Sequence, residues 1–188
     1  RLSFIGELGW EIYIPIKKTN IIFNKIKKLG KKYNLTYSGM HTLDILRLEK
    51  KFLHWGHDIT SEHNPFEAGL SFAVNFKKNQ NFIGRNYLEK IKNKPLSKRL
   101  ELFSLKNNFQ PGKPLILHDE PIFNKKKIVG YTTSSNYSFC YRKNIFLAYI
   151  NGNIKNHHNL SLEVEGRSYR IKLEKRAIHD PNSKFLKG

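Results

Sequence analysis

Two carboxylates near the start of the chain have types and neighbours that suit ligand binding. They are Glu7 and Glu11, and Glu11 lies between Trp10 and Ile12. A carboxylate among aromatic and apolar side chains can hydrogen-bond a planar heterocycle rich in N–H groups, while the aromatic neighbours supply stacking surface. A strand carboxylate that faces solvent, or that pairs with a lysine, produces the same pattern, so this alternative stays open.

Arg47 is a second charged residue in an apolar context, between Leu46 and Leu48. Its planar guanidinium presents a fork of donors that matches a carboxylate. A buried structural pair with Asp44 or Glu49 would use the same fork, and the sequence does not separate the two interpretations.

The histidines of the central region do not form a metal motif. His54 and His57 flank Trp55, and a metal site would need further ligands at compatible spacing. Asp58 and His63 follow without a cysteine or a His-x3-His spacing to complete a set. We therefore predict no metal site.

Other reactive side chains also lack the partners that catalysis needs. Ser134, Ser135 and Cys140 lie outside a nucleophile-elbow pattern and beside no evident histidine. The glycine-rich loops that cradle phosphates are absent. The pair His157 and His158 lies in an asparagine-rich stretch and is predicted to be a surface turn. The residues alone leave the catalytic group unknown.

The charge of the chain is its most marked overall property, with 34 Lys and Arg against 15 Asp and Glu, a formal net charge of +19. Such a charge attracts anionic partners, and a basic nucleic-acid-binding module is one function class that it suggests. The basic residues come in short clusters without an Arg/aromatic ladder. We therefore interpret most of them as solvated surface and predict no nucleic-acid partner.

Length and composition favour a packed fold. Among the 188 residues 39% are hydrophobic, which is enough for a core. No stretch approaches the roughly 20 apolar residues of a membrane span, so no membrane partner is expected. The single Cys140 excludes an internal disulfide and is typical of a reducing compartment, so we predict a cytoplasmic location.

The first half of the chain has mixed helix and strand patterns. We predict an opening hairpin with strands at 1–5 and 10–14. A helix follows from residue 19 or 20 to Gly30, and a second helix runs from residue 38 or 42 through Leu46, with an extended exit over 46–49. A buried strand is expected over 67–74 and a helix over 86–92.

The second half reads as a series of short strands. They are expected at 100–105, 114–117, 121–123, 128–133, 145–150, 160–164 and 169–173. Short strands with a turn signal every 8–12 residues or so are typical of a small barrel or sandwich. The fold class is therefore α+β followed by a small antiparallel β-barrel or sandwich, with the boundary placed between residues 97 and 98.

Several stretches resemble one family in their order along the chain. They are RLSFIGELGWEIYIP, LDILRLEKKFLHWGHDI, NPFEAGLSFAVNFKKNQNFIGR, DEPIFNKKKIVGYTTSSNYSF, NIFLAYI and KRAIHDP. Together they are similar to the folate-binding aminomethyltransferases, the family of the glycine cleavage T-protein. The tryptophan in HWGHDI and the string NPFEAGL resemble the branch of dimethylglycine and sarcosine dehydrogenases, with a T-protein proper as the alternative.

The resemblance implies tetrahydrofolate as a cofactor and a small methylated amine as a substrate, oxidised at an FAD-dependent part of the same parent chain. It aligns Glu11 with the carboxylate that holds the pterin. It also carries Glu7 and Arg47 to the folate site or its support, and Trp55 to the cavity wall. Residues 1–97 would be the C-terminal part of the folate domain and residues 98–188 the barrel domain.

Two departures accompany the resemblance. Phe4 stands where the family often has tyrosine, so a hydroxyl contact from that position would be lost. The family's catalytic aspartate lies in a segment that would precede Arg1, and so would the FAD domain. We therefore expect the chain to be a fragment that is inactive alone.

Overall fold

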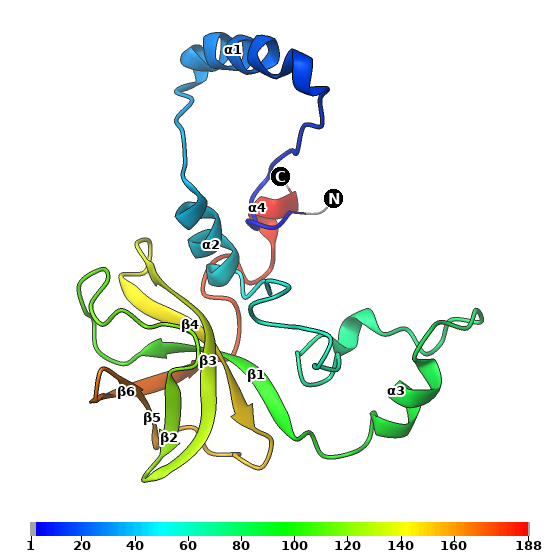
Figure 1. Cartoon of the computed structure of the whole chain (residues 1–188), viewed down its shortest axis with the longest axis vertical. Helices are drawn as coiled ribbons and strands as arrows, with labels where there is room; N and C mark the ends of the chain where they lie inside the picture. Colours follow the sequence, from blue (N-terminus) through cyan, green and yellow to red (C-terminus); the bar gives the residue numbers. More distant parts are fainter. Residues whose placement is uncertain (1–2, 188) are drawn as a thin grey trace.

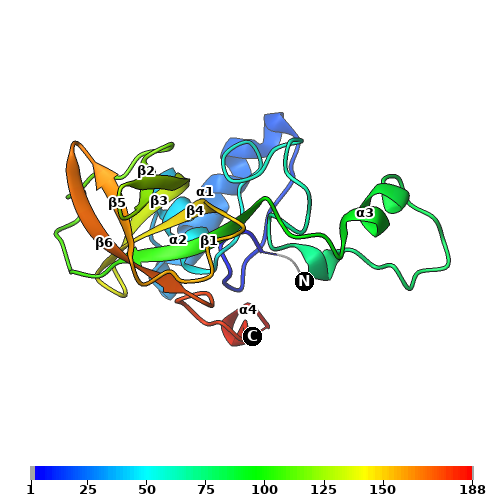
Figure 2. The same cartoon turned by 90° about the horizontal axis from the view of Figure 1, so that it is seen from below.

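A computed structural model describes residues 3–187. A β-barrel forms one end of the molecule, and the residues before Lys98 extend from it as short helices joined by long segments (Figures 1 and 2). Among the described residues, no helix has the length and apolar character to span a bilayer.

The barrel is closed by six antiparallel strands in the order β1-β4-β3-β2-β5-β6. Leu102 of β1 is opposite both Leu147 of β4 and Glu174 of β6, so this strand closes the ring. The strands are β1 Lys98–Leu105, β2 Pro121–Asn124, β3 Lys127–Ser138, β4 Lys143–Asn151, β5 Leu160–Val164 and β6 Arg167–Glu174. The predicted α+β class with an antiparallel barrel is confirmed.

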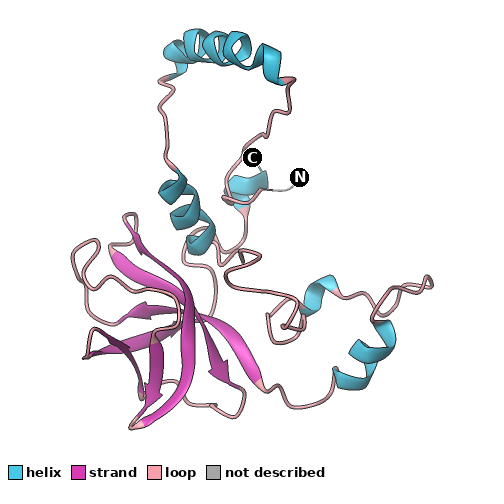
Figure 3. Ribbon diagram, in the orientation of Figure 1, coloured by secondary structure: helices cyan, strands magenta, loops and turns pink. Residues whose placement is uncertain are grey.

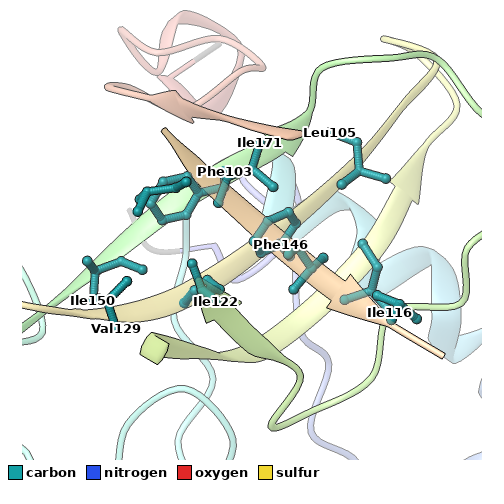
Figure 4. Close-up of a cluster of buried hydrophobic side chains, with 12 residues drawn as sticks. Phe103, Leu105, Ile116, Ile122, Val129, Phe146, Ile150 and Ile171 are labelled. Carbon is teal, nitrogen blue, oxygen red and sulfur yellow. The ribbon is translucent and has the colours of Figure 1, made fainter. Parts of the chain in front are cut away.

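Side chains alternate between the two faces of each strand, and the barrel therefore buries two clusters. The inner cluster centres on Phe103 and Phe146, whose stacked rings are 5.7 Å apart (Figure 4). The outer cluster includes Leu102, Leu147 and Leu48, and Leu48 belongs to helix α2, Met40–Glu49. Helix α2 is thus fixed to the outside of the barrel, and this contact positions the residues around it.

The other helices cover little of the barrel. They are η1 Ile16–Lys18, α1 Thr19–Gly30, η2 Lys31–Tyr33, η3 Ser71–Ala73, α3 Arg85–Ile91 and α4 Lys184–Lys187. Helix α1 stands apart at the end of two long segments and buries no residue, so apolar side chains such as Ile26 and Leu29 are exposed (Figure 3). The helices predicted around Gly30, Leu46 and residues 86–92 are confirmed.

The predicted opening hairpin is wrong. Residues 3–15 form bends and irregular structure, while residues 1 and 2 of the predicted first strand lie outside the described residues. A two-stranded hairpin alone has marginal stability. Within the described residues, no strand forms a β-ladder with residues 3–15, and Trp10 and Tyr13 are exposed.

Three further element predictions need correction. Residues 46–49 continue helix α2 because Leu48 packs on the barrel. The predicted strand over 67–74 is a turn followed by η3, because the Asn64 side chain accepts hydrogen bonds from the amides of Phe66 and Glu67. Residues 114–117 form a loop that buries Ile116 in the inner cluster.

Candidate functional site

Glu11 lies on the wall of an open hollow of about 730 Å³. The hollow is formed by the N-terminal segment and one residue of helix α2, with Ser3, Phe4, Ile5, Gly9, Trp10 and Leu43 as its other lining residues. Trp10 is 80% exposed. The site therefore combines an accessible carboxylate with aromatic and apolar walls, and its size suits a small organic ligand.

The Glu11 carboxylate keeps one oxygen available. Its Oε2 accepts a hydrogen bond of 2.6 Å from the hydroxyl of Tyr13. This hydrogen bond, together with the negative charge of Glu11, raises the pKa of Tyr13, so the tyrosine remains a donor at neutral pH. Among the described residues, none donates to Glu11 Oε1 within hydrogen-bond distance, which leaves this oxygen free to accept from a ligand.

Glu7 points to a different part of the molecule. Its Oε1 is 2.7 Å from Nε2 of His179, which lies in the segment after β6. Nδ1 of His179 is 3.2 Å from the hydroxyl of Tyr141, and its ring stacks on Phe185. The His179 amide donates to the carbonyl of Glu49 at 3.1 Å. Glu7 thus fastens the N-terminal segment to the C-terminal segment at the end of helix α2.

Lys50 supplies a second connection at the same place. Its Nζ donates to the carbonyl of Asp180 at 2.6 Å and is 3.2 Å from the carboxylate Oδ2. Burial raises the pKa of Asp180, but hydrogen bonds from the Lys184 amide and from Lys50 outweigh this effect and lower it. Gly6 has a φ of +75°, and a Cβ there would lie 2.2 Å from Cγ of Lys50. The chain needs glycine at this position.

Arg47 is almost fully buried, and its guanidinium is surrounded by acceptors. Nη1 donates to Oδ2 of Asp58 at 2.6 Å and to the carbonyl of Phe52 at 3.2 Å. Nη2 donates to the Ser134 hydroxyl at 2.8 Å, and Nε reaches Asp44 at 3.4 Å. The buried structural pair is therefore present. Asp58 is its nearest carboxylate, the expected Asp44 is a second partner at 3.4 Å, and Glu49 instead accepts a hydrogen bond from Ser138.

Trp55 is 66% exposed in a turn that runs from His54 to Ile59. The turn is closed by a hydrogen bond of 2.8 Å from the Gly56 amide to the Ile59 carbonyl. The His54 ring lies 5.8 Å from the ring of Phe4, and Phe4 lines the Glu11 hollow. The four predicted site residues thus do not converge on one cavity.

A small polar hollow beside Arg47 was not expected from the sequence. It has a volume of about 250 Å³ and includes four histidines: His41, His54, His57 and His118. Within residues 3–187, no group of three or more His, Cys, Asp or Glu side chains is arranged to hold a metal ion. The contact between Asp58 and Arg47 was not predicted, because no sequence spacing links these two residues.

Comparison with known proteins supports the motif resemblance. A family model for the GCVT N-terminal domain matches residues 1–78, and one for the glycine cleavage T-protein C-terminal barrel domain matches residues 98–180. The chain belongs to the glycine cleavage T-protein family. Both matches follow the chain order of the quoted motifs.

The relatives within the T-protein family are longer than this chain. Mouse mitochondrial dimethylglycine dehydrogenase is 32% identical over 170 residues, which are 90% of this chain and 19% of the relative. Human mitochondrial sarcosine dehydrogenase is 30% identical over 196 residues, 100% of this chain and 21% of the relative. The chain spans about a fifth of the length of these proteins.

The T-protein fold is also seen in the comparison with solved structures. The crystal structure of glycine cleavage system aminomethyltransferase T from Bartonella henselae has a TM-score of 0.81 at 22% identity. The matched region covers 95% of this chain and 48% of the Bartonella henselae chain. At this identity the likeness establishes the shared fold.

Proposed function

We propose that this chain is the tetrahydrofolate-binding part of an enzyme that oxidises an N-methyl amine such as dimethylglycine or sarcosine. The observation that carries the proposal is the Glu11 carboxylate, which has one free oxygen in a hollow walled by Phe4 and Trp10. It stands at the position where the family resemblance expects the pterin-binding acid.

In this proposal Glu11 accepts hydrogen bonds from the amino and ring N–H groups of the pterin. A charge-assisted contact of this kind is stronger than a neutral one and fixes the orientation of the ring. The rings of Phe4 and Trp10 offer apolar faces for stacking. Tetrahydrofolate would supply the acceptor for a one-carbon unit, giving methylenetetrahydrofolate.

The remaining predicted residues support the site from a distance. Glu7 holds the N-terminal segment against His179, and Arg47 holds the turn that carries Trp55 through Asp58. Both residues are therefore proposed as positioning residues. Trp55 is proposed as a wall of the complete cavity, because its exposed indole is available for contact.

Residues 1–97 and 98–188 are proposed as parts of two domains of a larger enzyme. Helix α1 exposes the apolar side chains of Ile21, Phe23 and Ile26, which another part of the polypeptide would cover. That remainder would contain the FAD-dependent oxidase module and the catalytic aspartate, and the chain alone would be inactive. Amine recognition would also belong there.

An aminomethyltransferase of the glycine cleavage system is the second candidate, favoured by the structural likeness to the Bartonella henselae protein. It would use the same Glu11 contact. The predicted cytoplasmic location stays a prediction, since both dehydrogenase relatives are named as mitochondrial. A basic nucleic-acid-binding role has only the net charge of +19 in its favour.

Folate binding by the full-length protein tests the proposal. Glu11→Gln removes the charge of the acceptor and should weaken tetrahydrofolate binding by about 1.5–3 kcal/mol, or about tenfold to a hundredfold in Kd. Isothermal titration calorimetry measures this change. Glu62→Gln, on an exposed turn, is the matched control and should bind as the unmodified protein does. An unchanged Kd in Glu11→Gln would remove Glu11 from the pterin site.

A further inference from the structure

The barrel carries a further hollow, of about 570 Å³, that shares no lining residue with the Glu11 hollow. It lies among the connection from β4 to β5, strand β6 and the residue that follows β1. Its lining consists of Lys106, Lys155, Asn156, His157, His158, Ile171, Lys172, Leu173 and Lys175. None of these residues takes part in the proposed folate site.

The lining is strongly basic. It includes four lysines and no aspartate or glutamate. Within residues 3–187, the ammonium groups of Lys106, Lys155 and Lys175 have no ion-pair or hydrogen-bond partner, whereas Lys172 is 3.4 Å from Glu174. Glu174 also accepts a hydrogen bond of 2.7 Å from the Ser104 hydroxyl. Of the four lysines that line the hollow, only Lys172 pairs with a carboxylate in the described part of the chain.

His157 adds an unsatisfied polar atom to this basic wall. Its Nε2 is buried and has no hydrogen-bond partner in the described part of the chain. Burial lowers the pKa of His157, and the nearby charge of Arg99 lowers it further, so the ring is neutral at neutral pH. A buried polar atom without a hydrogen-bond partner costs free energy. The predicted turn is present, since the Leu160 amide donates to the His157 carbonyl at 3.4 Å. His158 is exposed as predicted, whereas the side chain of His157 is half-buried near Phe103.

The setting distinguishes these lysines from the other basic clusters. Lys25, Lys27 and Lys28 lie on helix α1, which stands apart from the barrel (Figure 1), and their side chains are exposed. A concave wall of one sign focuses the electrostatic potential and concentrates counter-ions. The barrel hollow therefore has the stronger attraction for an anion of its size.

We propose that this hollow binds a small anion with several negative charges on clustered phosphate or carboxylate oxygens. Each lysine contributes up to three N–H donors. The ring of His157 also lines the hollow, so a bound anion would lie beside it. The residues Ile171 and Leu173 close the hollow with apolar surface, which reduces the screening of the charges by water.

Tripolyphosphate binding to the full-length protein at low salt tests the proposal. The triple variant Lys155→Gln, Lys172→Gln and Lys175→Gln should bind about tenfold more weakly than the unmodified protein. The matched control, Lys25→Gln, Lys27→Gln and Lys28→Gln on α1, lowers the net charge equally and should keep the affinity. Equal losses in both variants would overturn the proposal, because binding would then follow net charge alone.

Two further readouts sharpen the result. The imidazole NMR signal of His157 should shift when tripolyphosphate is added to the unmodified protein. It should stay unchanged in the triple variant of Lys155, Lys172 and Lys175. A signal that does not move in the unmodified protein would count against the site. Titration with triglutamate distinguishes the two sources of charge, since tighter binding of one probe assigns phosphate or carboxylate. Failure of both probes to bind would refute the proposal without affecting the Glu11 prediction.

Discussion

The guanidinium of Arg47 and the carboxylate of Asp58 form an ion pair 2.6 Å long that is closed off from solvent. Asp58 is 0% exposed, and it also accepts hydrogen bonds from the His54 amide at 2.8 Å and from the Thr133 hydroxyl at 2.6 Å. The pair therefore joins helix α2, the turn after it and strand β3. All three elements border the small histidine-lined hollow.

Loss of the carboxylate should strongly destabilise this junction. In Asp58→Asn the buried Arg47 loses its fully buried counter-charge and keeps only the partly exposed Asp44 at 3.4 Å, so we expect the free energy of unfolding to fall by about 3–5 kcal/mol. Urea denaturation of the full-length protein measures the change. Glu89→Gln, which breaks the exposed pair with Arg85, should stay within about 0.5 kcal/mol. Similar values for the two variants would contradict a specific role for the buried pair.

Gly6→Ala should be destabilising because two costs coincide there. The residue has a φ of +75°, which is unfavourable for alanine, and the new Cβ would meet Lys50 while that side chain is held by Asp180. We expect a loss of about 1–3 kcal/mol in the free energy of unfolding. Gly112→Ala has a φ of +73° but no atom within 4 Å of the new Cβ, so it isolates the backbone cost. A loss no larger than in this control would show that Lys50 moves aside easily.

Asp180 should make the stability of the protein sensitive to acid. Its pKa in the folded state is lower than its ordinary value of 3.8, so the unfolded chain binds the proton first. The contribution is complete above that ordinary value and is lost as the pH falls through the folded pKa. The free energy of unfolding, measured from pH 6 down to about pH 2, should fall less steeply in Asp180→Asn than in the unmodified protein.

The exposed Asp119 provides the control for this measurement. Its side chain is 73% exposed, and within the described residues its carboxylate pairs only with His118, so Asp119→Asn should retain the acid dependence of the unmodified protein. If Asp180→Asn also retained it, other carboxylates would have to account for the loss of stability in acid.

The barrel was predictable because its information is local. A continuous apolar run defines the strand at 145–150, and alternating apolar residues define the strand at 160–164. Three of the six pairings join consecutive strands. The other three, β1 with β4, β1 with β6 and β2 with β5, join strands that are distant in the chain. Residues 114–117 have the apolar pattern of a strand but form a loop, in which Ile116 is buried without strand pairing. Burial alone does not distinguish a strand from a packed loop.

The candidate site depended more on distant contacts. The apolar setting of Glu11 indicated a ligand contact from the sequence, and the structure places it in a hollow, although its proposed role rests on the family resemblance. The partners of Glu7 and Arg47 were not predictable, because His179 is 172 positions from Glu7 and Asp58 faces Arg47 across a turn. No periodicity reports such pairs.

The sequence by itself determined the barrel, the helices with a clear apolar period and the family, since these depend on residue patterns that are contiguous in the chain. Only the tertiary structure decided which polar groups meet. In the folded chain Glu7 and Arg47 connect separate segments, and Glu11 keeps one oxygen without a partner. Lysines from separate segments line one hollow. The physical reason is that side-chain contacts follow from distances in the folded state, which the order of residues does not record.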